Sequence, residues 1–421
     1  MKKVLIITYY WPPKRSVGAL RWYYFSKYLP SFGYNPIVYT THNSKSKFIA
    51  ENPIDNDIQV IRKTIFDPSN IFSKITGSNI NQGVLSNTNS LFIKLLNWIR
   101  VNFFIPDSRK FWINPSVSFL NKFIKQNNIK TIITTGPPHS IHLIGYRIKN
   151  LHKINWIADF RDPWSNWDIL KEMNPNLSLL NKHKELEMKV LKSADKILVT
   201  NKNLAKEFQE KIDLKKITII TNGTLLKFKN NKYNYNKFKI SYLGLMNKLR
   251  YPGIFFDSLK EIILKNNDIG KELEIFISGP IDNSIYNNLK NDNILGKYLK
   301  YEEYVDYEKT FYHYKTSSLL LLLLNKNSIN TTPTKIFDYA ISGKKILTLG
   351  NKKDENIDNL LKEFSLDKRI LYSDKNSIKK IILQSYKNYK NKKRIKLSHN
   401  LKKYDRKYLT EKLSKVLNSF C

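Results

Sequence analysis

The sequence predicts an α/β protein made of two doubly wound domains with parallel sheets. Short runs of β-branched and apolar residues alternate with longer amphipathic stretches along the whole chain, which is the pattern of strand–helix–strand units. The 421 residues suffice for two or three domains. An Asn-, Lys- and Tyr-rich break over residues 223–237 separates two series of these units. We therefore expect one sheet on each side of the break.

The expected strands fall into two series. In the first series they span residues 4–8, 37–40, 59–61, 131–135, 156–158, 197–200 and 218–221. In the second series they span residues 239–243, 273–278, 318–324 and 346–349. From residue 375 onward, apolar residues recur at helical spacing among Lys and Arg, which predicts two helices covering a sheet edge. We expect domains at 1–225 and 226–400, with a final helix over 401–421 that packs back on the first domain.

Composition limits the classes of protein to which the chain can belong. An apolar fraction of 41% excludes a wholly disordered chain. The 72 Lys and Arg against 35 Asp and Glu give a formal net charge of +37, which attracts anionic lipids, nucleic acids or phosphorylated metabolites. No apolar run reaches the ~18 residues needed to span a bilayer, and the start of the chain lacks a signal-peptide pattern. With Cys421 as its single cysteine, the chain has no intramolecular disulfide, and we expect a cytoplasmic protein.

The segment from Leu91 to Ile105 is unusually apolar for a protein of this charge. It is dense in Leu, Ile, Phe and Trp, and only Lys94 and Arg100 are charged. It is too short to cross a membrane, but it suits a helix lying at a membrane surface. A buried core helix accounts for it equally well, so both interpretations stay open.

Ligands of doubly wound sheets bind beyond the carboxyl ends of the strands, so the loops after the strands are the places to search. The loop after the first strand carries basic residues and Gly18 before a helix, where a phosphate could approach closely; an ordinary connection explains it equally well. The loop at 135–140 opens a helix with His139 at its start. We expect His139 to be exposed and to contact a polar substrate, and His142 to be packed inside.

A cluster of charged residues directly follows the strand at 156–158. Asp159, Arg161 and Asp162 can bind hydroxyl groups or act as a base with its positioning group. The alternative is an internal ion pair that holds the loop. We favour the functional interpretation.

In the second half, cations follow the strand that ends near Gly244. Lys248 and Arg250 lie in the next loop, and two cations at the carboxyl end of a strand suit a diphosphate leaving group.

A second anion-binding feature begins at residue 332. Thr332 is a good N-cap and Pro333 a good first helical residue, which would leave the amides of Thr334 and Lys335 free to bind an anion. Asp338, one turn on, would accept hydrogen bonds from a ribose diol. An ordinary capped helix explains the cap but not its coincidence with the basic loop.

No metal site is expected. His139 and His142 have the spacing of a ligand pair but no third ligand nearby. The acidic pair Asp55 and Asp57 precedes a strand instead of following one, so we interpret it as part of a turn.

These loops give the sequence a resemblance to the retaining glycosyltransferases of family 4, which have the GT-B fold of two facing Rossmann-like domains. The stretches that carry the resemblance cover nearly the whole chain and run in family order: ITYYWPPKRSVGALRWYYFSKYLPSFGY, IPDSRKFW, TTGPPHSIHLIG, ADFRDPW, ADKILVTN, ITNGT, SYLGLMNKLRYPG and TKIFDYAISGKKIL. They match the family without indicating a particular sugar.

The resemblance implies that the second domain binds a nucleoside-diphosphate-sugar and the first domain binds the acceptor, with transfer across the cleft between them. The implied donor-binding residues are Gly18, Gly244, Lys248, Arg250, Asn330, Thr334, Lys335 and Asp338. The implied acceptor-binding residues are Arg21, His139, Arg161 and Asp162. The implied catalytic residues are His139, Asp159, Lys248 and Arg250. No metal and no other cofactor is implied.

The sequence departs from the family pattern at three places. Asn330 and Asp338 stand where the family usually has two Glu, and an amide cannot stabilise positive charge. Leu245 stands where a basic residue often follows the diphosphate-loop glycine, which moves that role to Lys248 and Arg250. The first loop has one glycine where relatives often have two.

The expected function is transfer of a hexosyl group from a nucleotide-sugar to a lipid-linked or cell-surface polysaccharide precursor, such as that of lipopolysaccharide. The expected location is cytoplasmic and peripheral on the inner face of the cell membrane, with an anionic membrane surface as a partner. One alternative is a non-catalytic scaffold of the same fold, which Asn330 motivates. Another is a basic protein that binds nucleic acid or membrane surfaces; we expect no specific nucleic-acid partner, because no recognition module is present.

Overall fold

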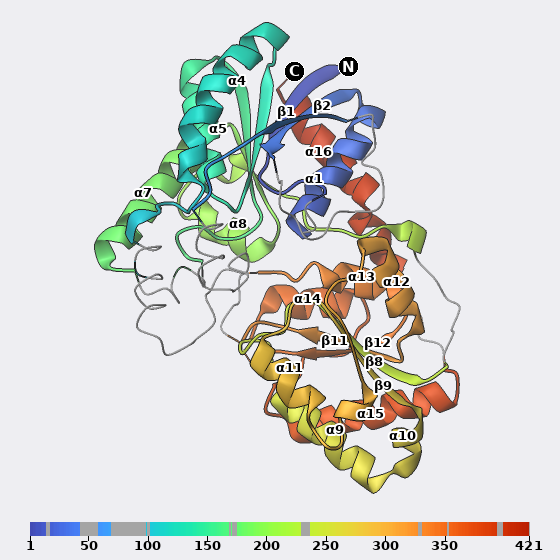
Figure 1. Cartoon of the computed structure of the whole chain (residues 1–421). Helices are drawn as coiled ribbons and strands as arrows, with labels where there is room; N and C mark the ends of the chain where they lie inside the picture. The colour runs from blue at the N-terminus through green and yellow to red at the C-terminus, as the bar shows by residue number, and fades with distance from the viewer. Residues whose placement is uncertain are drawn as a thin grey trace. The chain divides into compact units, whose positions relative to one another are not determined.

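The computed structural model describes residues 1–13, 17–42, 58–68, 98, 102–167, 170, 175–228, 236–326, 331–351, 353–393 and 399–420. The chain divides into two compact units (Figure 1). Unit 1 contains Met1–Asn222 together with Arg406–Cys421, and unit 2 contains Gly223–Asp405. Among the described residues, no helix is both long and apolar enough to cross a membrane.

Unit 1 is built on a seven-stranded parallel sheet with the order β3-β2-β1-β4-β5-β6-β7. Its strands are β1 (Lys2–Ile7), β2 (Tyr34–Thr41), β3 (Gln59–Lys63), β4 (Thr131–Gly136), β5 (Asn155–Phe160), β6 (Lys196–Val199) and β7 (Ile217–Ile219). Its helices include α1 (Val17–Tyr28), α4 (Ile113–Asn127), α5 (Ser140–Leu151), α7 (Leu177–Ser193), α8 (Lys202–Gln209) and α16 (Arg406–Asn418). The short 3-10 helices are η1 (Leu29–Phe32), η3 (Lys110–Trp112) and η4 (Leu214–Lys216).

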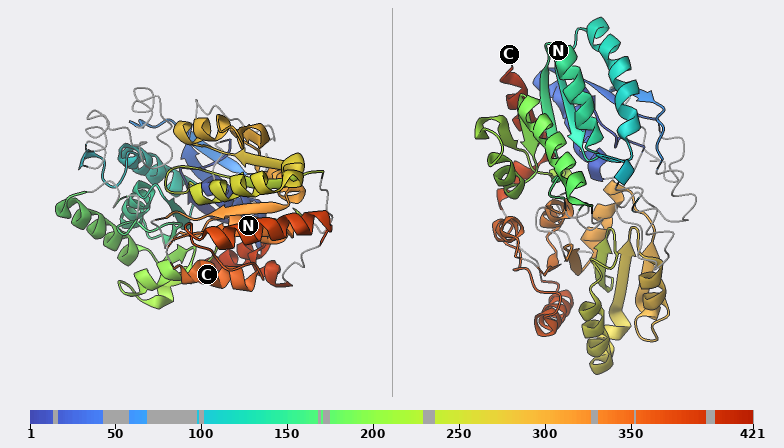
Figure 2. Two further views of the ribbon diagram at one scale, coloured as in Figure 1. Left: turned by 90° about the horizontal axis from the view of Figure 1, so that it is seen from below. Right: turned by 90° about the vertical axis from the view of Figure 1, so that its left-hand side faces the viewer.

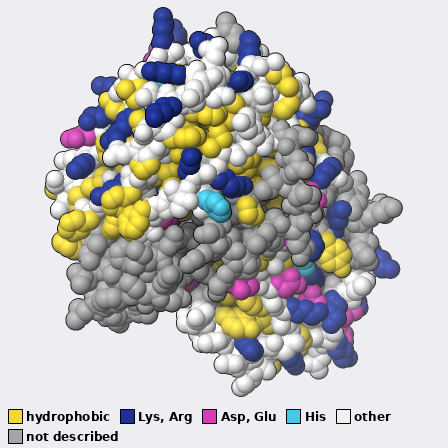
Figure 3. All heavy atoms as spheres, turned by 45° about the horizontal axis from the view of Figure 1, so that its top comes forward, with side chains coloured by type: hydrophobic (Ala, Val, Ile, Leu, Met, Phe, Trp, Pro, Cys, Tyr) yellow, Lys and Arg dark blue, Asp and Glu magenta, His cyan; other side chains and the backbone are white. Residues whose placement is uncertain are grey.

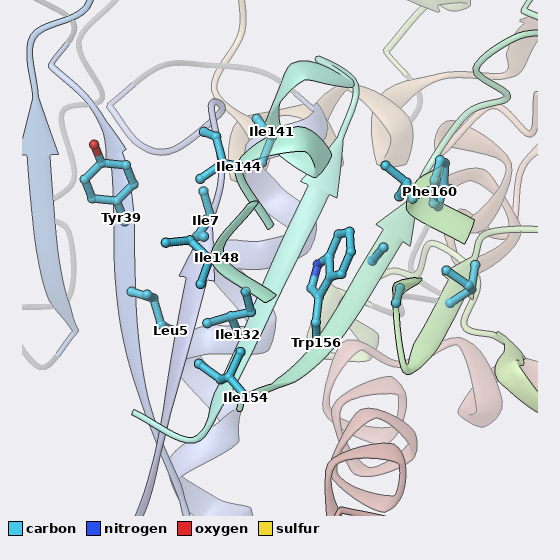
Figure 4. Packing of buried hydrophobic residues seen from close by; sticks show 14 of the residues in the cluster. Leu5, Ile7, Tyr39, Ile132, Ile141, Ile144, Ile148, Ile154, Trp156 and Phe160 are labelled. Atoms are coloured by element: carbon cyan, nitrogen blue, oxygen red, sulfur yellow. The ribbon is translucent and has the colours of Figure 1, made fainter. Parts of the chain in front are cut away.

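Helices cover both faces of this sheet, as Figure 2 shows. On β1, Leu5 and Ile7 point into the core under α4 and α5, whereas Val4 and Ile6 point into the core under α1 and α16. This alternation is the two-residue period of a strand buried on both sides. Figure 4 shows the first core, where isoleucines of α5 pack against β1 and β4, with Trp156 of β5 beside them.

Unit 2 is built on a five-stranded parallel sheet with the order β10-β9-β8-β11-β12. Its strands are β8 (Phe238–Leu243), β9 (Leu273–Ser278), β10 (Leu299–Glu302), β11 (Leu319–Leu323) and β12 (Lys345–Leu349). Its helices are α9 (Gly253–Lys265), α10 (Asn267–Glu272), α11 (Asn283–Lys290), α12 (Tyr307–Thr316), α13 (Lys335–Ser342), α14 (Glu355–Glu363) and α15 (Lys375–Lys390), and its 3-10 helices are η5 (Leu226–Phe228), η6 (Gly296–Tyr298) and η7 (His399–Tyr404).

The faces of this sheet are also covered by separate helix layers. On β11, Leu319, Leu321 and Leu323 pack with α9, α11 and α15, while Leu320 and Leu322 pack with α12, α13 and α14. The two segments that connect the units lie side by side, because Thr224 pairs with Asp405 in a parallel bridge.

The predicted fold class is confirmed: both domains are doubly wound around parallel sheets. Every predicted strand is present, with ends shifted by up to three residues. The sequence analysis missed β10, an edge strand whose sequence LKYE lacks a continuous apolar run. Of the two tail helices, α15 packs against α9 in unit 2, and α16 packs against α1 in unit 1. Asp55 and Asp57, and most of the segment 91–105, lie outside the described residues.

Candidate functional site

Each sheet has one point at which the strand order reverses, and in such folds ligands bind beyond the carboxyl ends of the strands that flank this point. In unit 1 the reversal lies between β1 and β4, and in unit 2 it lies between β8 and β11. The residues that follow these four strands are therefore the candidates in each unit.

In unit 2, Lys335 at the start of α13 reaches the end of β8. Its Nζ lies 4.2 Å from the centre of the Tyr242 ring. A Cβ on Gly244 would lie 2.2 Å from the same Nζ, so only glycine leaves room for this ammonium group. Gly244 also has φ of +147°, a conformation that side chains disfavour. The glycine after β8 thus serves both the turn and the close approach of a cation.

Arg250 adds a second positive charge near this cation. Burial, followed by the guanidinium group of Arg250, lowers the pKa of Lys335 to about 7. Neither side chain forms an ion pair with a described carboxylate. Two cations held together without a carboxylate repel each other, and an anion bound between them would relieve this repulsion.

Lys248 differs from Arg250, although the sequence pairs them. The Lys248 side chain is exposed, and its backbone amide donates to Asp282 Oδ2 at 3.3 Å. No described contact joins its ammonium group to Lys335 or Tyr242. The structure thus groups Arg250, Lys335 and Gly244, and no described side-chain contact adds Lys248 to this group.

The start of α13 corrects one prediction. The helix begins at Lys335, so Thr332 is not its N-cap and Pro333 is not its first residue. Instead, Thr332 Oγ1 accepts a hydrogen bond from Asn356 Nδ2 at 2.7 Å. The Ile336 amide donates to Pro333 O at 3.1 Å. The amides of Thr334 and Lys335 have no hydrogen-bond partner among the described residues. Binding of an anion to these amides stays a prediction.

Asp338 is buried within unit 2. Its Oδ1 accepts hydrogen bonds from Thr224 Oγ1 at 2.7 Å and from the Tyr307 hydroxyl at 3.0 Å. These bonds tie α13 to the segment before η5 and to α12, which gives Asp338 a structural role of its own. Contact of Asp338 with a ribose stays a prediction. Asn330, the other position of the family's acidic pair, lies outside the described residues.

Sequence reasoning missed several residues at this edge of the unit 2 sheet. Lys326 follows β11, and its Nζ lies 5.1 Å from the centre of the Tyr372 ring. Gly279 follows β9 with φ of +114°, and a Cβ there would lie 2.8 Å from Gly244 O. Gly279 could have been found from the sequence, because it directly follows a predicted strand. Lys326 could not, because its contact with Tyr372 joins residues far apart in sequence.

In unit 1, Asp159 is fully buried in a network that uses both of its oxygens. Arg21 Nη2 lies 3.0 Å from Oδ1, while Trp22 Nε1 and Thr135 Oγ1 donate to Oδ2 at 2.7 and 2.9 Å. Arg21 also donates to the carbonyls of Ile220 and Thr221. The network joins α1, β4, β5 and the end of unit 1's sheet. The internal ion pair, weighed as the alternative, is present, but its cation is Arg21 and not Arg161.

Arg161 faces the start of α1. Its Nε donates to Gly136 O at 3.2 Å, and its Nη2 donates to Pro137 O. A Cβ on Gly18 would lie 2.0 Å from Arg161 Nη1, so the helix backbone approaches the guanidinium closely. Burial lowers the pKa of Arg161 and raises that of its neighbour Asp162, whose charge partly offsets the effect on Arg161. Gly18, Arg161 and the 136–137 turn therefore form one cluster.

The prediction that His139 is exposed is wrong. His139 is only 4% exposed, and its ring stacks on that of Trp164 with centroids 4.9 Å apart. Burial, followed by His142, lowers its pKa well below the usual range, so the ring is neutral near pH 7. His142 is buried as predicted, with Nδ1 2.9 Å from Thr134 Oγ1. The aromatic residue that buries His139 follows it by 25 positions, which no local pattern reveals.

Within the described residues, no group of three or more His, Cys, Asp or Glu side chains could hold a metal ion. The cations and amides at the start of α13 have the chemistry to bind a phosphate.

No protein-family model matches this sequence, and no curated protein sequence matches it. The structure is similar to solved structures over its whole length. Sucrose-phosphate synthase from Thermosynechococcus elongatus has a TM-score of 0.65 at 10% identity, with 100% of this chain and 99% of that chain covered. Anabaena HepE in complex with UDP-glucose has a TM-score of 0.61 at 10% identity, with both chains fully covered.

A third similar structure carries a different activity in its name. It is a protein from Listeria monocytogenes provisionally assigned as a UDP-N-acetylglucosamine 2-epimerase, with a TM-score of 0.60, 13% identity, and 100% and 97% of the two chains covered. At these identities the likeness establishes the fold, which is the GT-B type of two Rossmann-like domains.

Proposed function

We propose that the protein is a retaining glycosyltransferase of family 4 that uses a nucleoside-diphosphate-sugar as donor. One observation carries the proposal: Lys335 and the amides at the start of α13 lie at the strand-order reversal of unit 2, Arg250 is close enough to lower the pKa of Lys335, and neither cation forms an ion pair with a described carboxylate. A diphosphate supplies the missing negative charge. The structures of similar fold include one with UDP-glucose, which supports this donor class.

In the proposed reaction, the bond between the sugar's anomeric carbon and the diphosphate oxygen breaks, and an acceptor hydroxyl oxygen bonds to that carbon in its place. The hydroxyl proton passes to the departing nucleoside diphosphate. Negative charge grows on the leaving diphosphate while the sugar gains oxocarbenium character. Cations and amides already aimed at the diphosphate stabilise that charge more in the transition state than in the ground state. Arg250 and Lys335 are assigned this role, with Lys248 assisting, and no metal ion is assigned one.

The acceptor is assigned to unit 1. Arg161, Asp162, His139 and Gly18 lie at or beside the reversal between β1 and β4, while Arg21 and Asp159 hold the loops in place. We assign as acceptor a lipid-linked or cell-surface polysaccharide precursor, and as location the inner face of the cell membrane. The net charge of +37 supports this location, because it favours an anionic surface.

A thermal-shift panel of UDP-, GDP- and ADP-sugars tests donor binding, because a ligand that binds only the folded protein raises its melting temperature. We expect one nucleotide series to raise the melting temperature of the wild type, and Arg250→Ala to reduce that shift. The exposed Lys290→Ala, elsewhere in unit 2, is the matched control and keeps it. No shift with any nucleotide-sugar would contradict the proposal.

A second candidate function is binding of a nucleotide-sugar without transfer of the sugar. It is favoured because both carboxylate oxygens of Asp159, a residue that the family resemblance implies to be catalytic, are engaged in a buried network. Product analysis after incubation with the stabilising donor separates the candidates. Release of nucleoside diphosphate indicates transfer or hydrolysis, an isomeric nucleotide-sugar indicates epimerisation, and unchanged donor indicates binding alone.

A further inference from the structure

A cluster of exposed aromatic residues lies on unit 1, outside the two strand-order reversals. The described part of the chain exposes four large Phe and Trp side chains: Phe66 at 60%, Trp98 at 56%, Phe103 at 58% and Phe111 at 43%. All four belong to this cluster. Single exposed apolar residues are ordinary on a protein surface, but a group of them marks an interaction site.

Ring contacts hold the cluster together. Phe66 and Phe111 lie 5.5 Å apart between ring centroids, and Trp98 and Phe103 lie 5.9 Å apart. Lys110 joins the two pairs, because its Nζ lies 5.2 Å from the centre of the Phe111 ring and donates a hydrogen bond to Phe103 O. The exposed rings therefore form one continuous surface, which we call the aromatic surface.

A cavity of about 680 Å³ opens beside Phe103 and Phe111, between the segment 102–115 and helices α5 and α7. Ile105, Leu143 and Leu186 are among the apolar side chains that line it.

The charged residues around this cavity have one sign. Lys110, Arg147 and Lys182 line it, and none of its described lining residues is Asp or Glu. Arg147 and Lys182 are exposed, and the Arg147 guanidinium donates to the Asn114 side chain, which leaves its charge unneutralised. In the upper part of the face drawn in Figure 3, Lys and Arg likewise lie among hydrophobic patches with few Asp and Glu, whereas Asp and Glu gather in its lower part.

We propose that the aromatic surface and its cationic cavity dock this protein onto the head groups of an anionic lipid bilayer. Aromatic rings prefer the boundary between head groups and acyl chains, and nearby Lys and Arg add attraction to anionic lipids. The charge complementarity selects a bilayer over a second copy of the chain, because two copies would bring together cations of the same sign. The inference rests on the proposed membrane location and not on the transfer reaction.

Vesicle flotation tests the docking without any nucleotide. We expect the wild type to bind vesicles of equal parts phosphatidylcholine and phosphatidylglycerol at low salt. High salt should release it from these vesicles, and vesicles of pure phosphatidylcholine should not bind it. Replacing the aromatic pair, Phe103→Ser with Phe111→Ser, weakens binding about tenfold. Replacing the cationic pair, Arg147→Gln with Lys182→Gln, weakens it by about the same factor and removes the preference for the anionic lipid.

Matched controls show whether the surface or the overall charge is responsible. Tyr312→Ser removes an equally exposed ring from unit 2, and Lys206→Gln with Lys290→Gln removes the same charge elsewhere. Both controls should bind like the wild type. Equal loss in the controls, or no binding of the wild type to anionic vesicles, would overturn the proposal. Concentration-dependent dimers that the aromatic substitutions abolish would also overturn it, in favour of a protein interface.

Fluorescence localises the contact in a folded protein. Trp98 should shift its emission to the blue when anionic vesicles are added, and Trp98→Phe should lose that shift. A shift that persists in Trp98→Phe contradicts the assignment of this surface. Because the vesicle experiments need no donor, their failure and a failure of the UDP-sugar thermal shift remain separate results.

Discussion

The two strand-order reversals of this protein differ in how their charges are neutralised. In unit 1, the carboxylate of Asp159 meets Arg21, and Arg161 donates to the carbonyls of Gly136 and Pro137. In unit 2, Arg250 and Lys335 form no ion pair with any described carboxylate. The comparison shows that unit 1 uses its buried ion pair to fix loops, whereas the cations of the proposed donor site in unit 2 are not neutralised by any described carboxylate.

The largest expected effect concerns Asp159. Asp159→Ala leaves Arg21 buried without its partner, and breaking such a pair costs about 3–5 kcal/mol in the free energy of unfolding. Denaturant unfolding of the whole protein, following the transition of unit 1, measures this loss of stability. Glu411→Ala, which removes an exposed ion pair with Lys415 in the same unit, should cost less than about 1 kcal/mol. If Asp159→Ala keeps full stability and only turnover falls, Asp159 is catalytic and the contrast between the units fails.

The next effect concerns the cations of unit 2. Replacing both Lys248 and Arg250 by Ala should raise the transition-state free energy by about 2–4 kcal/mol, measured as kcat/KM. Because Lys248 is exposed and Arg250 lies near Lys335, Arg250→Ala alone should account for most of the loss. Unchanged turnover in the double variant would remove these residues from the mechanism.

A pair of glycine substitutions compares the two units directly. Gly244→Ala should cost about 1–3 kcal/mol of stability and reduce nucleotide-sugar binding, because of its φ of +147° and the collision with Lys335. Gly18→Ala should cost less stability than Gly244→Ala, since Gly18 is helical and needs no left-handed conformation, so that only the displacement of the hydrogen-bonded Arg161 guanidinium opposes the new Cβ. Unfolding curves measure the stability of both variants, and thermal shifts measure their nucleotide-sugar binding. Equal losses in the two variants would contradict the difference between the two glycines.

The smallest expected effect is a pH dependence of donor binding. Lys335 has a pKa of about 7 in the free protein, so it is protonated below this pH and neutral above it. A UDP-sugar should bind the protonated form, and its affinity should fall by up to about tenfold per unit as pH rises above 7. Titration calorimetry checks this, and Lys335→Met should abolish the dependence. A pH-independent affinity in the wild type would contradict the role of Lys335.

The lowered pKa of Lys335 also predicts how the stability of the ligand-free protein depends on pH. The unfolded chain holds the Lys335 proton up to pH of about 10.5, whereas the folded protein releases it near 7. The unfolded state therefore binds more protons between these values, and Lys335 makes the folded state more stable as pH rises through this window.

Much of the fold could be predicted from the sequence because its strands are buried on both faces. Continuous apolar runs such as that of β11 mark such strands clearly, while the edge strand β10 is half exposed and carries no such mark. Loop chemistry indicated Gly244 and Arg250, because cations and glycine after a strand are local features.

The pairing of charges could not be predicted in this way. Asp159 has Arg161 two positions away, yet its partner is Arg21, 138 positions earlier. The position of Lys335 over Tyr242 and the burial of His139 against Trp164 also depend on contacts between separate elements. Side chains choose their partners in three dimensions, so a sequence shows which charges are available but not which of them neutralise one another.

The return of α16 to unit 1 has a consequence for synthesis on the ribosome. Leu409, Leu413 and Leu417 belong to the core that Val4 and Ile6 begin, so this core cannot close until the last helix has emerged. Unit 2 is contiguous and can finish first. A nascent chain that stalls after residue 405 would thus carry a complete second unit and a first unit in which α1 alone, without α16, covers this part of the sheet.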